Sequence, residues 1–198
     1  VLTGVCQDIN RIEVKRVIHA ATRRVPFQKK IGVGLKVEEF EEKMDKKLIT
    51  GHVGLEQSMM MIADTLGWNL QNIQVGTVKP VVAEEPLENE AVKVELGYVV
   101  GLRQTATGIM NGKSVIILDF QAYIGAEEYD SITINGKPEI HEKISPCIHG
   151  DIGTVAMIVN SIPKVLNAPP GLMTMKDLPI PSASIEDMRT YLKRKKPS

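Results

Sequence analysis

The chain has 198 residues with 24 basic and 24 acidic side chains and a hydrophobic fraction of 43%, which suits a soluble protein with one or two globular domains. A net charge of zero argues against a nucleic-acid-binding protein, and the basic tail at residues 191–198 is short and terminal. The longest apolar run, residues 152–162, is interrupted by small and polar residues and is too short to span a membrane, so we expect no membrane partner. The two cysteines are far apart and match no metal spacing, which favours free thiols in a reducing compartment and predicts a cytoplasmic location.

Three elements are predicted in the first third of the chain. Residues 10–22 alternate apolar and charged side chains with a period of two, which predicts a half-buried strand. Residues 36–48 carry apolar side chains at helical spacing, with acidic residues early and lysines late, and predict a surface helix. A second helix is predicted over residues 55–66, with Gly67 ending it.

The middle of the chain, residues 73–144, is rich in Val, Ile, Thr and Tyr. Asn-Gly pairs at 111–112 and 135–136 are strong hairpin signals. We therefore expect a sheet of four or five strands that is largely antiparallel. The order of a strand, two helices, several strands and a last helix predicts the α+β class, with a mixed, largely antiparallel sheet covered by helices.

The last long element is predicted over residues 152–166, where apolar side chains cover most of the helix girdle, which is typical of a buried helix. Pro163 is expected to kink or end it. Just before it, the sequence His149-Gly150-Asp151 allows two interpretations. Asp151 is either the cap of the helix or part of a site at the positive end of the helix dipole.

Two further groups of polar residues could serve a chemical function. The segment 19–34 leaves the first strand and contains four cations and a threonine that could bind an acidic substrate: Thr22, Arg23, Arg24, Lys29 and Lys30. His52 and His149 are candidates for proton transfer near neutral pH. A solvated charge cluster and hydrogen-bonded structural histidines are the alternative interpretations. No ligand spacing for a metal appears, and Cys6 and Cys147 are expected to be free thiols.

Three long stretches carry a family resemblance: HAATRRVPFQKKIGVGLKVEEFEEK, TGHVGLEQSMMMIADTLGW and IHGDIGTVAMIVNSIPKVLNAPPGLMTMKDLP. In this order they resemble the C-terminal domain of the 2,4-diaminopentanoate dehydrogenases, which are similar to dihydrodipicolinate reductases. The resemblance spans nearly the whole chain. Members of the group carry an N-terminal Rossmann domain that binds NAD or NADP. The present sequence has no G-x-G-x-x-G motif, so we expect this chain alone to bind no cofactor.

The resemblance implies that the full-length protein is an oxidoreductase acting on the CH–NH2 group of a small diamino acid. It would oxidise the C4 amine of 2,4-diaminopentanoate and release 2-amino-4-oxopentanoate and ammonia. Residues 1–198 would then be the substrate-binding and oligomerisation domain, inactive alone and forming a homodimer or higher homo-oligomer. In this interpretation the cations of segment 19–34 and Thr22 bind the substrate, Asp151 binds its ammonium group, and His149 or His52 is the base.

Two other interpretations remain open. Reductases of the dihydrodipicolinate type carry a His-His pair in the loop after the first strand, whereas this sequence has Ala21 and Thr22 there. The chain could therefore belong to a reductase-like enzyme that acts on another substrate. It could also be a stand-alone ligand-binding or assembly module. A strand followed by G-x-G-x-x-G upstream of Val1 would exclude the module.

Overall fold

The computed structural model describes residues 1–88 and 93–192, so most of the basic tail at residues 191–198 lies outside the described residues. The chain divides into two compact units. The sheet unit comprises residues 2–147, and the C-terminal unit comprises residues 148–198 together with Val1.

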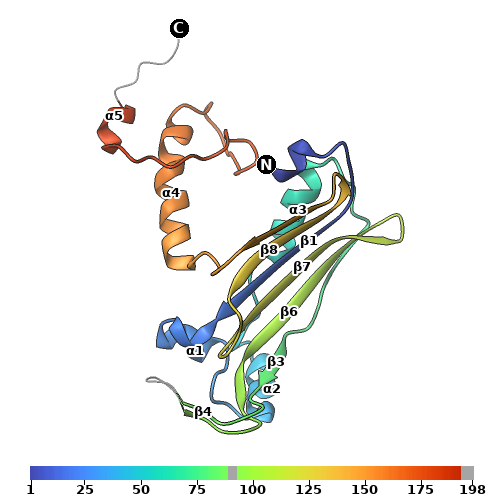
Figure 1. The fold of residues 1–198 in the computed structure, drawn as a ribbon, viewed down its shortest axis with the longest axis vertical. Helices are drawn as coiled ribbons and strands as arrows, with labels where there is room; N and C mark the ends of the chain where they lie inside the picture. Colours follow the sequence, from blue (N-terminus) through green and yellow to red (C-terminus); the bar gives the residue numbers. More distant parts are fainter. Residues whose placement is uncertain (89–92, 193–198) are drawn as a thin grey trace. The chain divides into compact units, whose positions relative to one another are not determined.

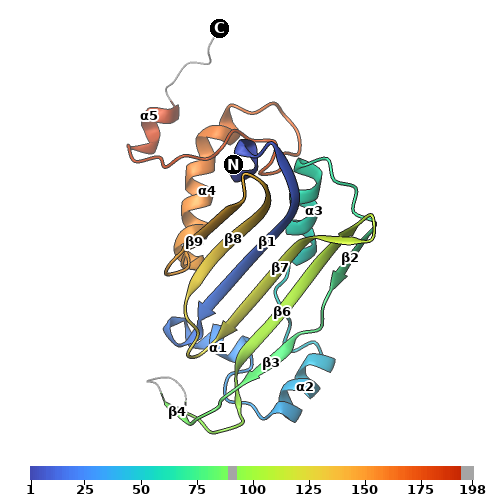
Figure 2. The ribbon, with the colours of Figure 1, turned by 45° about the vertical axis from the view of Figure 1, so that its right-hand side comes forward.

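The sheet unit is built on a seven-stranded mixed sheet with the order β2-β6-β7-β1-β8-β9, in which β3 also pairs with β6 (Figures 1 and 2). Its strands are β1 (Asp8–His19), β2 (Asn72–Val75), β3 (Lys79–Val82), β6 (Val99–Met110), β7 (Lys113–Tyr123), β8 (Tyr129–Lys137) and β9 (Ile140–Ile144). The pair β1–β7 is parallel, and the other pairs of this sheet are antiparallel. A separate short pair joins β4 (Leu87–Glu88) to β5 (Lys93–Val94).

The α+β class and the largely antiparallel sheet are confirmed, but the expected four or five strands were too few. The short strands β2 and β3 both pair with the long β6, and the N-terminal β1 lies between β7 and β8. Of the two Asn-Gly signals, Asn111-Gly112 forms the β6–β7 turn, with φ of 51° and 71°. Asn135-Gly136 instead lies inside β8, and a Cβ on Gly136 would come within 2.1 Å of the Asp8 carbonyl oxygen. Glycine is needed there because β1 approaches closely, not because the chain turns.

The helices of the sheet unit are η1 (Leu2–Val5), η2 (Ala20–Thr22), α1 (Val25–Lys30), α2 (Val37–Asp45) and α3 (Leu55–Thr65). The two predicted helices, α2 and α3, are confirmed. The core that they form with the sheet includes Phe40 from α2 and Met59 from α3, which are 1% and 0% exposed. A Cβ on Gly108 of β6 would lie 2.8 Å from the Met59 sulfur, so glycine lets α3 approach the sheet. Segment 19–34, for which no helix was predicted, contains η2 and α1.

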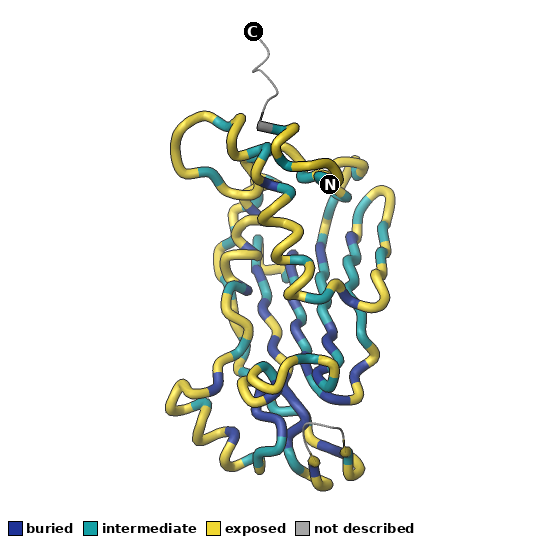
Figure 3. Tube along the Cα trace, turned by 90° about the vertical axis from the view of Figure 1, so that its left-hand side faces the viewer, coloured by how far each residue is buried: buried dark blue, intermediate teal, exposed yellow. Residues whose placement is uncertain are grey.

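The C-terminal unit contains α4 (Gly150–Leu166), a long connection and α5 (Met188–Leu192). The prediction that α4 is buried was wrong. Figure 3 colours most of this helix as exposed. Its exposed apolar side chains are Ile152, Val155, Met157, Ile158, Val159, Ile162, Val165 and Leu166. Pro163 does not end the helix, which continues to Leu166. A sequence pattern records how apolar a helix is but not which partner covers it.

Candidate functional site

The His52 side chain occupies the loop that leads into α3. Its imidazole stacks on the Phe120 ring of β7, with centroids 4.6 Å apart and planes inclined by 26°. Its backbone N–H donates a 2.9 Å hydrogen bond to Gln104 Oε1 of β6, and Gln104 Nε2 donates to the Gly76 carbonyl oxygen at 3.0 Å. The ring and the backbone of His52 are thus both held against the sheet.

Glycine at position 51 makes this arrangement possible. A Cβ there would lie 2.1 Å from Gln104 Oε1 and 2.6 Å from the Val78 side chain, both well inside van der Waals contact. Gln104 is 9% exposed, and burying its amide is tolerated because both polar ends are hydrogen-bonded. The sequence TGHVG therefore places a histidine on a loop whose backbone is hydrogen-bonded to Gln104 of the sheet.

The electrostatics around His52 favour its neutral form. Desolvation by the surrounding protein lowers the pKa of the His52 imidazole below its usual 6.5, and the positive charges of Arg16 and Lys30 lower it further. His52 and Lys30 also line one open pocket of about 220 Å³, with Phe120 and Leu102 as its apolar walls. A neutral imidazole beside an ammonium group can accept a proton while the cation binds a carboxylate.

The three other histidines have ring nitrogens committed to the protein. His19 Nδ1 accepts the Gly125 N–H at 3.1 Å, and His141 lies 3.3 Å from both Glu139 and Thr133. His149 Nδ1 accepts the Asp151 N–H at 3.3 Å. Among the described residues, neither ring nitrogen of His52 takes part in a hydrogen bond, so its lone pair remains open to a ligand.

The cationic segment divides into an inner and an outer part. The Arg23 side chain is 9% exposed, forms an ion pair with Glu128 and lies with Nη2 3.5 Å from Cys147 Sγ. Burial and a 3.2 Å hydrogen bond to Glu128 raise the pKa of the Cys147 thiol to about 11. Arg23 and the Cys147 thiol thus both bind the Glu128 carboxylate.

The rest of the segment is more accessible. Thr22 donates to the His19 carbonyl oxygen at 3.1 Å, so its hydroxyl hydrogen serves the local turn. Arg24, Lys29 and Lys30 are exposed on or next to α1, and of these Lys30 reaches the His52 pocket. The structure therefore brings together two of the predicted site residues of the sheet unit, His52 and Lys30.

The remaining predicted residues lie in the C-terminal unit, at the start of α4. Of the two interpretations of Asp151, the one as helix cap was wrong, because His149 is the N-cap and Asp151 lies in the first turn. When Nδ1 of a neutral histidine accepts a hydrogen bond, the proton resides on Nε2, so that nitrogen can only donate. His149 is therefore less suited than His52 to accept a proton while it caps α4.

Arg16 and Gln104 belong to the surroundings of His52 but were not among the predicted residues. Arg16 lies on the strand face that Ile12 and Ile18 share, pairs with Phe120 across β1–β7 and forms a 3.6 Å ion pair with Asp130. Gln104 interrupts the buried series of β6 in the same way. The signal in the sequence was a polar side chain at a position where the period of two places an apolar one.

Within the described part of the chain, no helix is both long and apolar enough to cross a membrane. Nor do three or more His, Cys, Asp or Glu side chains within residues 1–88 and 93–192 gather in a way that could hold a metal ion.

Comparison with known proteins adds a family. Residues 1–194 match the model of the 2,4-diaminopentanoate dehydrogenase C-terminal domain. The chain is 34% identical over 196 residues to a 2,4-diaminopentanoate dehydrogenase of Acetoanaerobium sticklandii, a match that covers 96% of this chain and 56% of that protein. An amine dehydrogenase from Mycobacterium smegmatis has a similar fold, with a TM-score of 0.76 and 20% identity over 91% of this chain and 54% of its own. The chain thus spans about half the length of these relatives.

Proposed function

Since the chain belongs to the family of 2,4-diaminopentanoate dehydrogenase C-terminal domains, we propose that it is the substrate-binding and oligomerisation domain of an enzyme that oxidises 2,4-diaminopentanoate. Hydride transfer to the nicotinamide of the full-length enzyme would give an imine, and one water would hydrolyse it to 2-amino-4-oxopentanoate and ammonia. The observation that carries this proposal is the pocket in which a histidine with a lowered pKa and uncommitted ring nitrogens lies beside Lys30.

The roles of the two side chains follow from the substrate. At neutral pH both amino groups of a diamino acid are protonated, and only a neutral amine can be oxidised to an imine. His52, which is neutral because its pKa is lowered, would remove a proton from the C4 ammonium group. Lys30 would bind the carboxylate through a charge-assisted hydrogen bond, and the Phe120 and Leu102 walls would exclude water from the carbon chain.

The nicotinamide cofactor, NAD or NADP, is placed outside residues 1–198 in this proposal. The sequence has no G-x-G-x-x-G motif, and the described sheet lacks the successive parallel strand–helix–strand units that hold a dinucleotide. The residues of this chain therefore do not fit a cofactor site of that type. When bound elsewhere in the full-length enzyme, the oxidised nicotinamide would accept the hydride from the substrate.

The exposed face of α4 supports a second domain. Its apolar side chains, such as Ile158 at 63% and Val155 at 60% exposure, would remain in water if the chain acted alone. The A. sticklandii relative has 44% of its length outside the match, because the match covers 56% of it. We assign this face to contact with the dinucleotide-binding domain of the full-length enzyme.

Oligomerisation is proposed for the opposite face of the sheet from the one that α3 covers. This face carries half-buried Tyr129, and part of its charge is paired within the chain, with Lys15 Nζ 3.5 Å from Asp119. Burying such a surface against a second copy would leave few uncompensated charges, and tyrosine is common in interfaces. The partner proposed here is a second copy of this chain.

The test is a substrate panel with the full-length protein, following reduction of NAD and of NADP. We expect activity with 2,4-diaminopentanoate, a loss in kcat of about 100-fold or more in His52→Gln, and a roughly tenfold higher KM in Lys30→Met. Lys29→Met removes a neighbouring exposed cation that does not line the pocket and is the matched control. Wild-type kinetics in both His52→Gln and Lys30→Met would refute the assigned site.

A further inference from the structure

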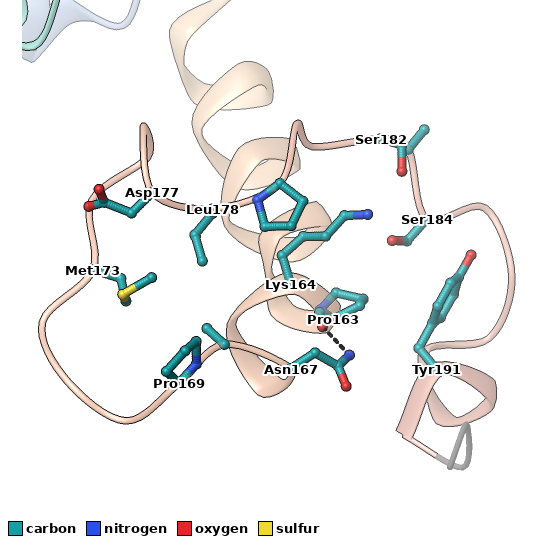
Figure 4. Close-up of a pocket in the computed structure, with 13 residues that line it drawn as sticks. Pro163, Lys164, Asn167, Pro169, Met173, Asp177, Leu178, Ser182, Ser184 and Tyr191 are labelled. Atoms are coloured by element: carbon teal, nitrogen blue, oxygen red, sulfur yellow. Dashed lines mark hydrogen bonds between the residues drawn. The ribbon is translucent and has the colours of Figure 1, made fainter. Parts of the chain in front are cut away.

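The C-terminal unit contains a second pocket, of about 580 Å³, between α4, the connection that follows it and α5 (Figure 4). It lies at the far end of α4 from His149 and Asp151. Lys164 follows Asp151 by 13 residues along the helix, which corresponds to about 20 Å at 1.5 Å per residue. The pocket is therefore separate from the site residues at the start of this helix.

The pocket uses the polar side of α4. Asn160, Lys164 and Asn167 recur at helical spacing on the side away from Val155, Ile158 and Ile162. Asn160 Oδ1 accepts the Ser184 N–H at 2.8 Å and fixes the connection to the helix. We assigned the apolar side of α4 to contact with the dinucleotide-binding domain. Because the pocket lies on the other side of the helix, that contact would leave the residues that line it accessible to a ligand.

The other side of the connection is also tied down. Asp177 Oδ2 accepts hydrogen bonds from the Thr174 N–H at 2.8 Å and the Thr174 hydroxyl at 2.6 Å, which lower the pKa of this carboxyl group. With the Asn160–Ser184 bond, these contacts hold the connection in a defined conformation on both sides of the pocket. Ligand pockets are usually preformed in this way, which reduces the entropic cost of binding.

Three hydrogen-bond donors of the pocket, Lys164, Ser182 and Ser184, gather on one side. In Figure 4 the Lys164 ammonium group points toward the side where Ser182 and Ser184 present their hydroxyls. Within the described residues, Lys164 forms no hydrogen bond or ion pair, and the two serine hydroxyls likewise form no hydrogen bond. One cation and two hydroxyl donors with no protein acceptor are suited to bind an anionic group.

The opposite side carries apolar side chains and the Asp177 carboxylate, whose Oδ2 already accepts two hydrogen bonds from Thr174. Met173 and Leu178 line the pocket together with Pro169 and Pro179, and Figure 4 shows Met173 and Leu178 across from the Lys164 ammonium group. A fully hydrated inorganic anion would gain little from these walls, whereas an apolar chain would bury surface there. The ligand class that matches both sides is a small organic acid with a short hydrocarbon chain.

We propose that this pocket binds a monocarboxylate, with its carboxylate on Lys164 and the two serine hydroxyls and its chain against Met173 and Leu178. The site is independent of the pocket proposed for the diamino acid, because none of its lining residues is shared with the His52 pocket. Its failure would leave the proposed dehydrogenase function untouched.

Calorimetric titration of the full-length protein with butyrate tests this site. We expect saturable millimolar binding, at least tenfold weaker binding of the neutral butyramide, and at least tenfold weaker binding of butyrate to Lys164→Gln. Lys164→Arg keeps the charge and should retain most of the affinity. Lys113→Gln removes an exposed lysine of the sheet unit and should bind butyrate like the wild type.

Three results would overturn the proposal. Equal affinity for butyrate and butyramide would remove the role of the carboxylate, and unchanged affinity in Lys164→Gln would remove the role of the cation. Binding of inorganic phosphate as tight as that of butyrate would show that the apolar walls do not select the ligand. Melting temperatures of all variants, measured on the same samples, establish that a loss of binding is not a loss of fold.

Discussion

The imidazole of His52 lies on the phenyl ring of Phe120 at a centroid distance of 4.6 Å, so a loop before α3 and the central strand β7 meet at one side chain pair. The contact removes water from one ring face and, with the nearby cations, disfavours protonation. The same geometry therefore fixes both the position and the protonation state of the proposed base.

The first prediction concerns the titration of His52. Because its pKa is lowered in the folded protein, its NMR titration midpoint should lie below 6.5. The imidazole of the unfolded chain therefore binds a proton more readily than that of the folded protein. The stability that neutral His52 contributes is fully present above pH 6.5 and is lost as the pH falls through the lowered pKa of the folded state. Lys30→Met should raise the midpoint, whereas Lys29→Met should not. A midpoint at or above 6.5 in the wild type would contradict the assigned environment.

A second prediction tests the glycine behind the histidine. Gly51→Ala places a methyl group 2.1 Å from Gln104 Oε1, so the loop or the glutamine must move. We expect a loss of about 1–3 kcal/mol in the free energy of unfolding, the usual range for overpacking, together with a higher KM because His52 shifts. Urea denaturation and steady-state kinetics measure the two effects. Gly4→Ala is the control, since no atom lies within 4 Å of its Cβ position, and an equal loss in both variants would disprove the argument.

A third prediction separates the inner from the outer arginine. Arg23→Ala leaves Glu128 and Cys147 in a largely buried cluster without their cation, which should cost on the order of 3 kcal/mol of stability. Arg24→Ala, at an exposed position, should stay within about 0.5 kcal/mol. The comparison is made by urea denaturation at neutral pH. If Arg23→Ala has the wild-type free energy of unfolding but a strongly raised KM, Arg23 binds substrate, as the sequence first suggested.

The ion pair between Arg23 and Glu128 shows what the sequence could and could not establish. Periodicity located β1, α2 and α3 because their apolar faces are buried within the same unit. The motifs located His52 and Lys30, which do share a pocket. Ion pairing between Arg23 and Glu128 joins residues 105 positions apart, and local sequence carries no information about such a contact.

The exposure of α4 was missed for a related reason. An apolar girdle indicates that a helix needs cover, but the covering surface need not belong to the same unit. The cap of α4 was missed because aspartate is the commoner N-cap, whereas here a histidine ring nitrogen accepts the backbone N–H. For the exposure of α4, the general preference for burying an apolar helix failed because no covering surface is present among the described residues of the unit. For its cap, the general preference for aspartate failed because of the specific contact of His149 Nδ1 with the Asp151 N–H.

A fourth prediction addresses assembly. Light scattering of the protein at tens of micromolar should give the mass of a dimer or a higher oligomer. Lys15→Glu places a second negative charge beside Asp119 on the sheet face proposed to be the interface, so it should shift the equilibrium toward the monomer. Lys113→Glu, at the exposed β6–β7 turn, is the control. A wild-type sample that shows only the monomer mass excludes the proposed interface.

The last prediction concerns the start of α4, where the structural and chemical roles of two neighbours can be separated. His149 caps the helix, so His149→Ala should lower stability by about 1 kcal/mol, the typical cost of losing an N-cap. Asp151 lies in the first turn, and Asp151→Asn should cost only a few tenths of a kcal/mol through the helix dipole. If its carboxylate also binds a substrate ammonium group, KM in the full-length enzyme should rise by roughly tenfold to a hundredfold in Asp151→Asn. Melting temperature and kcat/KM measured on the same preparations separate these effects. An unchanged kcat/KM in Asp151→Asn would restrict Asp151 to its structural place in the helix and leave His52 and Lys30 as the proposed substrate site.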